Sequence, residues 1–269
     1  MEQRKKEEQE FHNIIRSDEL LKNPSTYSYY MSNKKYYSIT RGSLKYFSDW
    51  LKEHCKNKVV LDYCCGDGRY SFQAAKYGAN VIGIDISDKT IEICKKKAVQ
   101  EKLEKQTSFF IMDAENLKFN DNSFDIIISM GVLHHLDLKK AYQEFIRVIK
   151  PNGRIICTEA LGHNPFIHLY RKITPHLRTK WEVEHILSLA DIKMSRCYFA
   201  KIKMKFFHLA TLVAVPFRNL PGFNTILKSL ETLDQILLSI PLIKKQAWMI
   251  IFILSEPRKE ILKNCRNLS

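Results

Sequence analysis

The 269-residue sequence predicts an α/β fold with a doubly wound, mostly parallel sheet. Between Val59 and Asp85, two short apolar runs flank a glycine-containing turn and a segment with helical spacing of apolar residues. Strand, helix and strand of these lengths form a parallel unit whose crossover is right-handed. A later run, Ile126–Ile128, is too short and continuous for an exposed helix and predicts another buried strand.

The turn after the first predicted strand is the leading candidate for a ligand site, because doubly wound sheets bind ligands at their carboxyl edge. Gly66 and Gly68 fit part of a dinucleotide-binding fingerprint, so that alternative stays open. Carboxylates at Asp62 and Asp67 would repel a pyrophosphate, however. A ligand with a cationic amino group and an adenosine ribose suits them better, with Asp62 near the ammonium and Asp85 accepting from the ribose hydroxyls.

This stretch resembles the cofactor-binding motif of the class I S-adenosylmethionine-dependent methyltransferases, in the small-molecule subset with a methyltransferase type 11-like domain. Asp62, Gly66, Gly68 and Asp85 match the motif, and Cys64 stands where its first glycine is usual. This departure matters little if Cys64, a small residue, can adopt the turn with φ below zero. The resemblance implies a Rossmann-like, seven-stranded sheet with an antiparallel pair at one edge, and S-adenosyl-L-methionine as cofactor. It also implies these cofactor-binding residues: Asp62, Cys64, Gly66, Gly68, Asp85, Ile86, Asp113, Ala114, Met130 and His135.

Composition narrows the functional classes. The formal net charge is +14, but the lysines are spread along the chain without a dense basic run interleaved with aromatics, so nucleic acid is not an expected partner. The seven cysteines form no Cys-x-x-Cys pair, and three histidines (His163, His168 and His176) lack compact ligand spacing, so no metal site is expected. The charged first residues contain no secretory signal, which predicts a cytoplasmic location. The sequence does not indicate an oligomeric state.

Residues 1–57 are predicted to form a helical lid over the substrate. The first ten residues are predicted to be a polar leader without regular structure, and residues 11–21 are predicted to form a helix. Another helix is predicted from Ser43 to His54. Tyrosines between the two helices offer apolar rings with hydroxyl groups, suited to an apolar pocket with a wet rim; packing of helices on the sheet is the alternative. They are Tyr27, Tyr29, Tyr30, Tyr36 and Tyr37.

Residues 58–200 are predicted to form the cofactor-binding core. Ser87 and Asp137 are predicted N-caps of two helices that run to about Leu103 and Ile149. The third strand is predicted at 108–112 and the fifth at 154–158, each bounded by turn residues.

Two histidines are candidate general bases. His134 follows the fourth strand, where the family's sulfonium and acceptor would meet, and histidine suits proton transfer near neutral pH. His163 follows the fifth strand in a loop rich in turn residues. Structural roles are the alternative for both, with methyl transfer then depending on alignment alone.

The C-terminal part departs from a minimal core. The final two strands are predicted at 193–200 and 247–254, with an apolar helical insertion at 201–246 and a strand and tail at 247–269. Leu227, Leu230 and Leu237 form a stripe at helical spacing. Packing on the domain explains them most simply; a substrate lid or peripheral contact with a membrane surface are the alternatives.

Together these features predict an enzyme that transfers a methyl group from S-adenosylmethionine to a small, apolar or amphipathic acceptor of natural-product, lipid or quinone-like character. Two alternatives stay open. One is an RNA methyltransferase, favoured by the positive charge, and the other is a non-catalytic S-adenosylmethionine-binding partner subunit. The pattern does not distinguish methylation at oxygen, nitrogen, carbon or sulfur.

Overall fold

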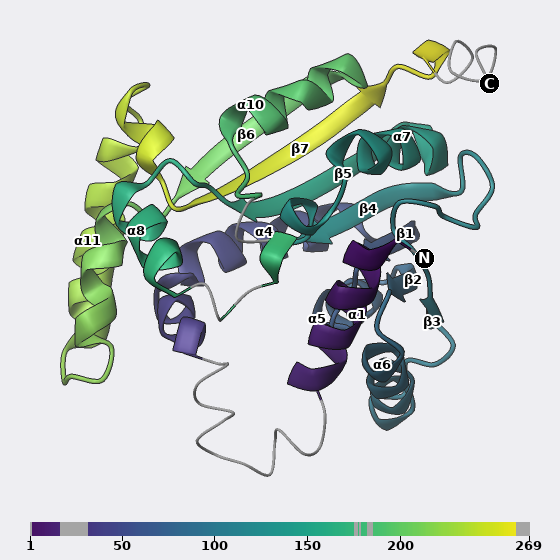
Figure 1. The fold of residues 1–269 in the computed structure, drawn as a ribbon, viewed down its shortest axis with the longest axis horizontal. Helices are drawn as coiled ribbons and strands as arrows, with labels where there is room; N and C mark the ends of the chain where they lie inside the picture. Colours follow the sequence, from purple (N-terminus) through teal and green to yellow (C-terminus); the bar gives the residue numbers. More distant parts are fainter. Residues whose placement is uncertain (1, 17–31, 175–176, 178, 182–184, 262–269) are drawn as a thin grey trace.

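The computed structural model describes residues 2–16, 32–174, 177, 179–181 and 185–261, and contains a seven-stranded sheet with helices on both faces (Figure 1). The strand order is β3-β2-β1-β4-β5-β7-β6. Strands β1 to β5 pair in parallel, and β7 runs antiparallel to both β5 and β6. This confirms the predicted sheet. The strands are β1 Val59–Tyr63, β2 Asn80–Asp85, β3 Thr107–Ile111, β4 Phe124–Met130, β5 Ile149–Ala160, β6 Phe199–Phe207 and β7 Met249–Pro257.

Helices cover the two faces because neighbouring residues of each central strand point to opposite sides. In β1, Leu61 packs in a cluster with Phe145, whereas Val60 packs in a second cluster with Phe47. The described α-helices are α1 Gln3–Ile15, α4 Arg41–His54, α5 Arg69–Lys76, α6 Asp88–Gln100, α7 Leu138–Val148, α8 Pro165–Ile173, α10 Leu189–Met194 and α11 Phe223–Leu237. The 3-10 segments are η1 Ser32–Ile39, η2 Leu133–His135, η4 Ser195–Cys197, η5 Ala210–Phe217 and η6 Ile243–Gln246.

Side-chain caps begin the helices that follow β2 and β4. Ser87 accepts from the amide of Thr90 at 3.1 Å, which confirms it as the N-cap of α6. Asp137 accepts from the amides of Lys139 and Lys140 at 3.0 and 3.2 Å and caps α7. Both caps satisfy amides that the first turn of a helix leaves without partners.

The N-terminal segment differs from the prediction. The expected polar leader is wrong, because α1 already begins at Gln3. Its Lys, Arg, Glu and Gln residues are strong helix formers, and several of their charges are paired with the domain rather than solvated. Arg4 and Lys5 contact Glu115, for example. The tyrosines at positions 27, 29 and 30, and the histidine at 176, lie outside the described residues.

The sixth strand also differs from the prediction. A strand at 193–200 is wrong, since Ser188 and Asp191 form a capping box that begins α10, and β6 starts only at Phe199. The residues of β6 alternate between outward lysines and half-buried apolar side chains, as expected for an edge strand. The lysines are Lys201, Lys203 and Lys205.

The insertion between β6 and β7 therefore occupies 208–248 rather than 201–246. Asp234 of α11 accepts from the amides of Leu209, Ala210 and Thr211, which fixes η5 against α11. Leu227 is 1% exposed and packs in a cluster with Ile167 of α8, so this part of the predicted leucine stripe packs on the domain. Within the described residues, no helix has both the length and the apolar character needed to cross a membrane.

Candidate active site

Two cavities meet at the carboxyl edge of the central strands. The turn cavity, of about 190 Å³, lies between the β1–α5 turn, the ends of β2 and β4, and helix α1. The tyrosine cavity, of about 750 Å³, lies between α4, α8 and the ends of β4 and β5. Met130, Gly131 and His135 line both cavities, so ligands bound in the two would approach each other at these residues.

Most of the predicted cofactor-binding residues line the turn cavity. Asp62 and Gly68 are the exceptions. The residues that the structure brings together there are Cys64, Gly66, Asp85, Ile86, Asp113, Ala114, Met130 and His135.

The β1–α5 turn has three residues in the left-handed region of backbone conformation. Cys64, Gly66 and Gly68 have φ of 57°, 53° and 74°. The condition of a negative φ at Cys64 is therefore not met: Cys64 takes the conformation that favours glycine, at a cost of about 1–2 kcal/mol. At Gly68 a Cβ atom would lie 2.8 Å from the Phe72 ring, so this glycine is required by both backbone and packing.

Asp85 ends β2 and fixes the same turn. Its Oδ2 accepts from the Gly66 amide at 3.0 Å, and its Oδ1 accepts from the Ser87 amide at 2.9 Å. The side chain is 7% exposed, and burial raises the pKa of Asp85 although the amide hydrogen bonds act in the opposite sense. It therefore presents a preorganised carboxylate at the wall of the turn cavity.

Asp62 has a different position from the one predicted. It is 2% exposed and lies behind the turn, outside the residues that line either cavity, where it accepts from the Ser71 hydroxyl at 2.6 Å. Burial raises the pKa of Asp62 to about 7. In this arrangement Asp62 ties α5 to β1, and it makes no direct contact with the space expected for a ligand ammonium.

Helix α1 forms a wall of the turn cavity through contacts that the sequence did not predict. Lys5 Nζ lies 2.8 Å from Asp113 and 2.9 Å from Glu115, and Arg4 donates to Glu115 at 2.5 Å. Gln9 donates to the Ile86 carbonyl at 2.9 Å. The residues that α1 contacts lie far from it in sequence. The sequence of α1 itself has the charged pattern of an ordinary solvated helix, so it gives no sign of these contacts.

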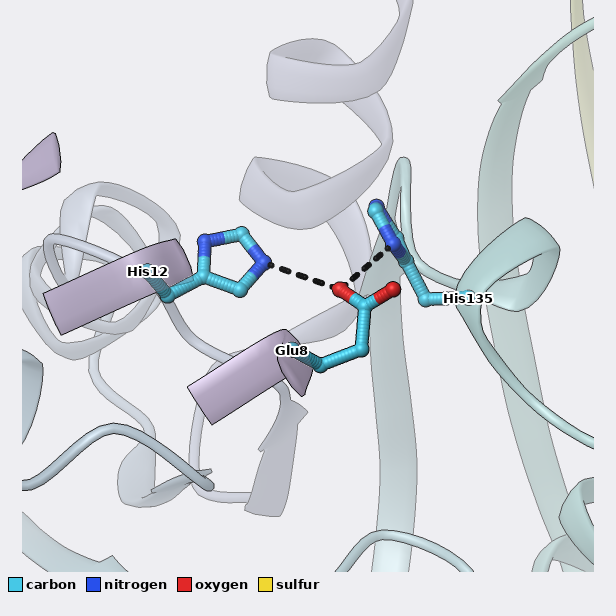
Figure 2. A group of neighbouring side chains, drawn as sticks. All are labelled: Glu8, His12 and His135. Atoms are coloured by element: carbon cyan, nitrogen blue, oxygen red, sulfur yellow. Dashed lines mark ion pairs between the residues drawn. The ribbon is translucent and has the colours of Figure 1, made fainter. Parts of the chain in front are cut away.

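A glutamate and two histidines lie side by side where α1 meets η2 (Figure 2). Glu8 Oε2 lies 3.7 Å from His12 Nε2 and 3.2 Å from His135 Nδ1, and the three ligand atoms are within 4.8 Å of one another. A metal ion fits that spacing. However, an Arg16 guanidinium nitrogen lies 3.1 Å from His12 Nδ1, and because arginine only donates, the neutral ring carries its proton on Nε2. Burial lowers the pKa of His12 to about 3, so this ring is neutral and its Nε2–H faces Glu8. The trio therefore joins α1 to η2 through close carboxylate–imidazole contacts rather than as an open ligand set.

His134 and Glu159 form a buried pair at the wall of the tyrosine cavity. Glu159 is 0% exposed; its Oε1 accepts from the amides of Val132 and Leu133 at 2.8 and 2.7 Å, and its Oε2 lies 2.8 Å from His134 Nδ1. A carboxylate here fixes the Nδ1 proton of the neutral ring, which puts the lone pair on Nε2. Sequence reasoning missed Glu159 as a partner, although it lies at the end of β5 just as Asp85 lies at the end of β2.

His163 is not part of this arrangement. It is exposed, lines neither cavity, and its Nε2 accepts from the Leu189 amide at 3.0 Å. The prediction of His163 as a second base is therefore corrected: this ring holds the start of α10 against the loop after β5.

Aromatic side chains make up much of the tyrosine cavity. Tyr36 and Tyr37, from the predicted lid, line it together with Trp248 of the segment before β7. The Tyr36 ring contacts Tyr170 edge to face at a centroid distance of 4.9 Å. Two guanidinium groups, from Arg69 and Arg171, add positive charge to its lining.

Comparison with known proteins agrees with this geometry. Residues 61–157 match the methyltransferase domain family. The chain is 36% identical over 124 residues to the ubiquinone/menaquinone biosynthesis C-methyltransferase UbiE of Zymomonas mobilis (45% of this chain and 51% of that protein), and 33% identical over 117 residues to the demethylmenaquinone methyltransferase of Lactococcus lactis (42% and 45%). It thus spans about half the length of the curated relatives it matches.

A solved structure extends the likeness in fold. The geranyl diphosphate C-methyltransferase of Streptomyces coelicolor superposes with a TM-score of 0.56 at 13% identity, covering 79% of both chains. At that identity the match concerns the fold alone. Residues 61–157 therefore match a methyltransferase domain, and the chain as a whole has the fold of a solved methyltransferase.

Proposed function

We propose that this chain binds S-adenosylmethionine in the turn cavity and transfers its methyl group to a small, quinone-like acceptor in the tyrosine cavity. The observation that carries the proposal is the His134–Glu159 pair, which lies beside the residues shared by the two cavities. A paired histidine at such a junction is suited to remove a proton from an acceptor while a methyl group arrives from the other side.

The residues of the turn cavity fit the cofactor. Asp85 would bind the ribose hydroxyls, and the carboxylate is already oriented by two backbone amides. Gly66 lines the cavity with backbone alone, and its φ of 53° lies in the region that favours glycine. The cofactor supplies an activated methyl group on a sulfonium. The cavity is smaller than the 300–1,000 Å³ typical of ligand sites, so α1 would have to shift as the ligand binds.

The tyrosine cavity supports an aromatic or amphipathic acceptor. Its volume lies within the usual range for small-molecule sites, and aromatic rings with a few polar groups are the common lining of such pockets. Rings of Tyr36, Tyr170 and Trp248 can stack against a planar acceptor. The names of the two bacterial relatives, which refer to quinone biosynthesis, favour a quinone-like ring among the acceptors considered.

Different residues would then serve the proton transfer and the methyl transfer. His134 Nε2 would take the proton from an acceptor hydroxyl or acidic carbon, and Glu159 would stabilise the resulting imidazolium. The cofactor held in the turn cavity would supply the methyl group. The walls of the two cavities contribute alignment, which can supply about 7–11 kcal/mol in well-oriented reactions. A low-dielectric, preorganised pair such as this one does not need to reorganise during the step.

Purified protein and isotope-labelled S-adenosylmethionine test the proposal. Label should pass to a water-soluble demethylated hydroquinone, and omission of the acceptor should abolish transfer. Transfer to RNA with steep salt dependence would favour the RNA alternative instead. Cofactor binding by calorimetry without transfer to any quinol or phenol would overturn the enzymatic assignment and favour the binding-subunit alternative.

A further inference from the structure

Helix α8 has two apolar faces, of which the domain covers only one. Ile167 is 5% exposed and lines the tyrosine cavity. On the opposite face, Phe166, Leu169 and Ile173 are 78%, 57% and 65% exposed. Their spacing of three and four residues puts them on one stripe of the helix. A wall of the tyrosine cavity therefore carries an uncovered apolar stripe on its outer side.

The neighbouring insertion has the same character. Its inner face packs through Leu227 into the cluster that also contains Ile167, so α8 and α11 lie at the same end of the molecule (Figure 1). Its outer residues are apolar as well, although part of the predicted leucine stripe packs inward. Of the sixteen large apolar side chains exposed among the described residues, eleven come from these two segments. They are Phe166, Leu169, Ile173, Val213, Phe217, Leu220, Ile226, Leu233, Ile236, Ile240 and Leu242.

We call this surface the insertion face (residues 165–173 and 210–245), and its exposed charges are predominantly positive. Its two acids are engaged within the fold. Glu231 pairs with Arg41 at 2.6 Å, and Asp234 is buried and accepts from backbone amides. The exposed charged side chains of the face are cations: Lys172, Arg218, Lys228 and Lys245. Apolar groups bordered by cations match the headgroup boundary of an anionic bilayer.

We propose that the insertion face docks on the surface of an anionic lipid bilayer, with α8 between the lipid and the tyrosine cavity. A second copy of the chain is a poorer occupant, because a two-fold contact would bring together two faces that both carry positive charge. The proposal that this face docks on lipid does not depend on the methyl-transfer reaction proposed above. The idea that an apolar acceptor passes from the bilayer past α8 into the cavity rests on the proposed function.

Cosedimentation with vesicles tests the docking surface. The full chain should partition onto phosphatidylcholine vesicles containing about one third phosphatidylglycerol and much less onto pure phosphatidylcholine. Raising salt from about 0.1 M to about 0.5 M should weaken the binding, because ions screen the cations. Partition that is equal on both vesicle types, or absent at low salt, would overturn the proposal.

Paired variants test whether vesicle binding depends on this face or on exposed apolar groups and positive charge anywhere on the protein. The triple variant Phe166→Ser, Leu169→Ser, Ile173→Ser should lose about tenfold or more in partition. Val99→Ser with Ile111→Ser, which removes similarly exposed apolar groups elsewhere, should lose none. Likewise Lys172→Glu with Lys228→Glu should lose about tenfold or more, and Lys95→Glu with Lys105→Glu much less. Equal losses in either matched set would contradict a defined docking face.

Two further measurements distinguish lipid docking from misfolding of the variant and from self-association. Thermal unfolding and cofactor affinity of the α8 triple variant should match those of the native chain, because its side chains project away from both cavities. Light scattering should give the same molar mass for the native chain and the variant. If the native chain is a dimer that dissociates in the variant, the face binds a second copy instead of lipid. If vesicle binding fails while a water-soluble acceptor is still methylated, only the docking proposal is lost.

Discussion

Replacing Glu159 by glutamine is the most direct test of the proposed proton transfer. The native Oε1 accepts from the amides of Val132 and Leu133, and Oε2 faces His134 Nδ1 at 2.8 Å. A glutamine carbonyl can take the place of Oε1, which puts its NH₂ group opposite Nδ1. Because that group only donates, Nδ1 must accept and the ring proton moves to Nε2. The ring would then present a proton to the acceptor, where the native tautomer presents a lone pair.

The expected loss follows from the role of a general base. Removing one typically costs about 10²–10⁴-fold in rate, which corresponds to about 2.7–5.5 kcal/mol in the barrier. Cofactor affinity should not change, since Glu159 does not line the turn cavity. Single-turnover methyl transfer measures the first quantity and calorimetry the second. His134→Ala should show a similar loss, and the double variant should lose no more than either single variant, because the two residues act as a unit.

Two controls make the result interpretable. His163→Ala removes the exposed histidine that lies outside both cavities, and it should keep native turnover. Thermal unfolding of Glu159→Gln should stay close to native, since the two amide hydrogen bonds persist. Retention of at least half the turnover in Glu159→Gln, or losses that multiply in the double variant, would refute the paired base.

Three other predictions concern the cofactor turn. Asp85→Ala should weaken S-adenosylmethionine binding at least about tenfold in calorimetry, because a charge-assisted hydrogen bond contributes about 1.5–3 kcal/mol; unchanged affinity would remove the ribose assignment. Burial raises the pKa of Asp62 from 3.8 to about 7, so the folded chain keeps a proton that the unfolded chain loses, and stability should fall as pH rises from about 4 to about 7 by up to ~4 kcal/mol. Asp62→Asn should therefore gain stability over the native chain at about pH 8 but not at about pH 4 in thermal unfolding; an equal difference at both would contradict this sign. Gly68→Ala should cost about 1–3 kcal/mol more in denaturant unfolding than Gly222→Ala, because both have positive φ but only the first places a Cβ against Phe72.

The central unit was predictable because its signals are local. The apolar runs at β1 and β2, the glycine turn between them and the acid at each strand end all lie within Val59 to Asp85, and a parallel crossover leaves little freedom in their arrangement. The caps Ser87 and Asp137 were predictable for the same reason, since a cap accepts from amides two or three residues away. The correct bounds of β6 could also have been predicted, because its alternation of lysine and apolar residues has the period of a strand.

The missed parts of the site depend on contacts between distant residues. Arg4 and Glu115 are 111 residues apart, and nothing near Arg4 distinguishes a paired arginine from a solvated one. Glu159 lies 25 residues from His134, and only the pairing of β4 with β5 brings them together. The same tertiary information separates His134 from His163: both follow sheet strands, but one lines a cavity and the other holds a loop.

Asp113 connects the unexpected helix with the expected ligand. The resemblance implies that this carboxylate binds the cofactor, yet here its Oδ2 lies 2.8 Å from Lys5 of α1. The cofactor and Lys5 would then compete for one carboxylate, and binding of S-adenosylmethionine would displace or reorient the start of α1. Lys5 is also 2.9 Å from the fully buried side chain of Glu115, so it can leave Asp113 and still keep a counter-charge. This second partner lowers the cost of exchange, because the lysine does not have to move as an unpaired cation. Because Lys5 has two carboxylate partners, α1 can cover the cavity in the absence of ligand and still move aside when a ligand binds Asp113.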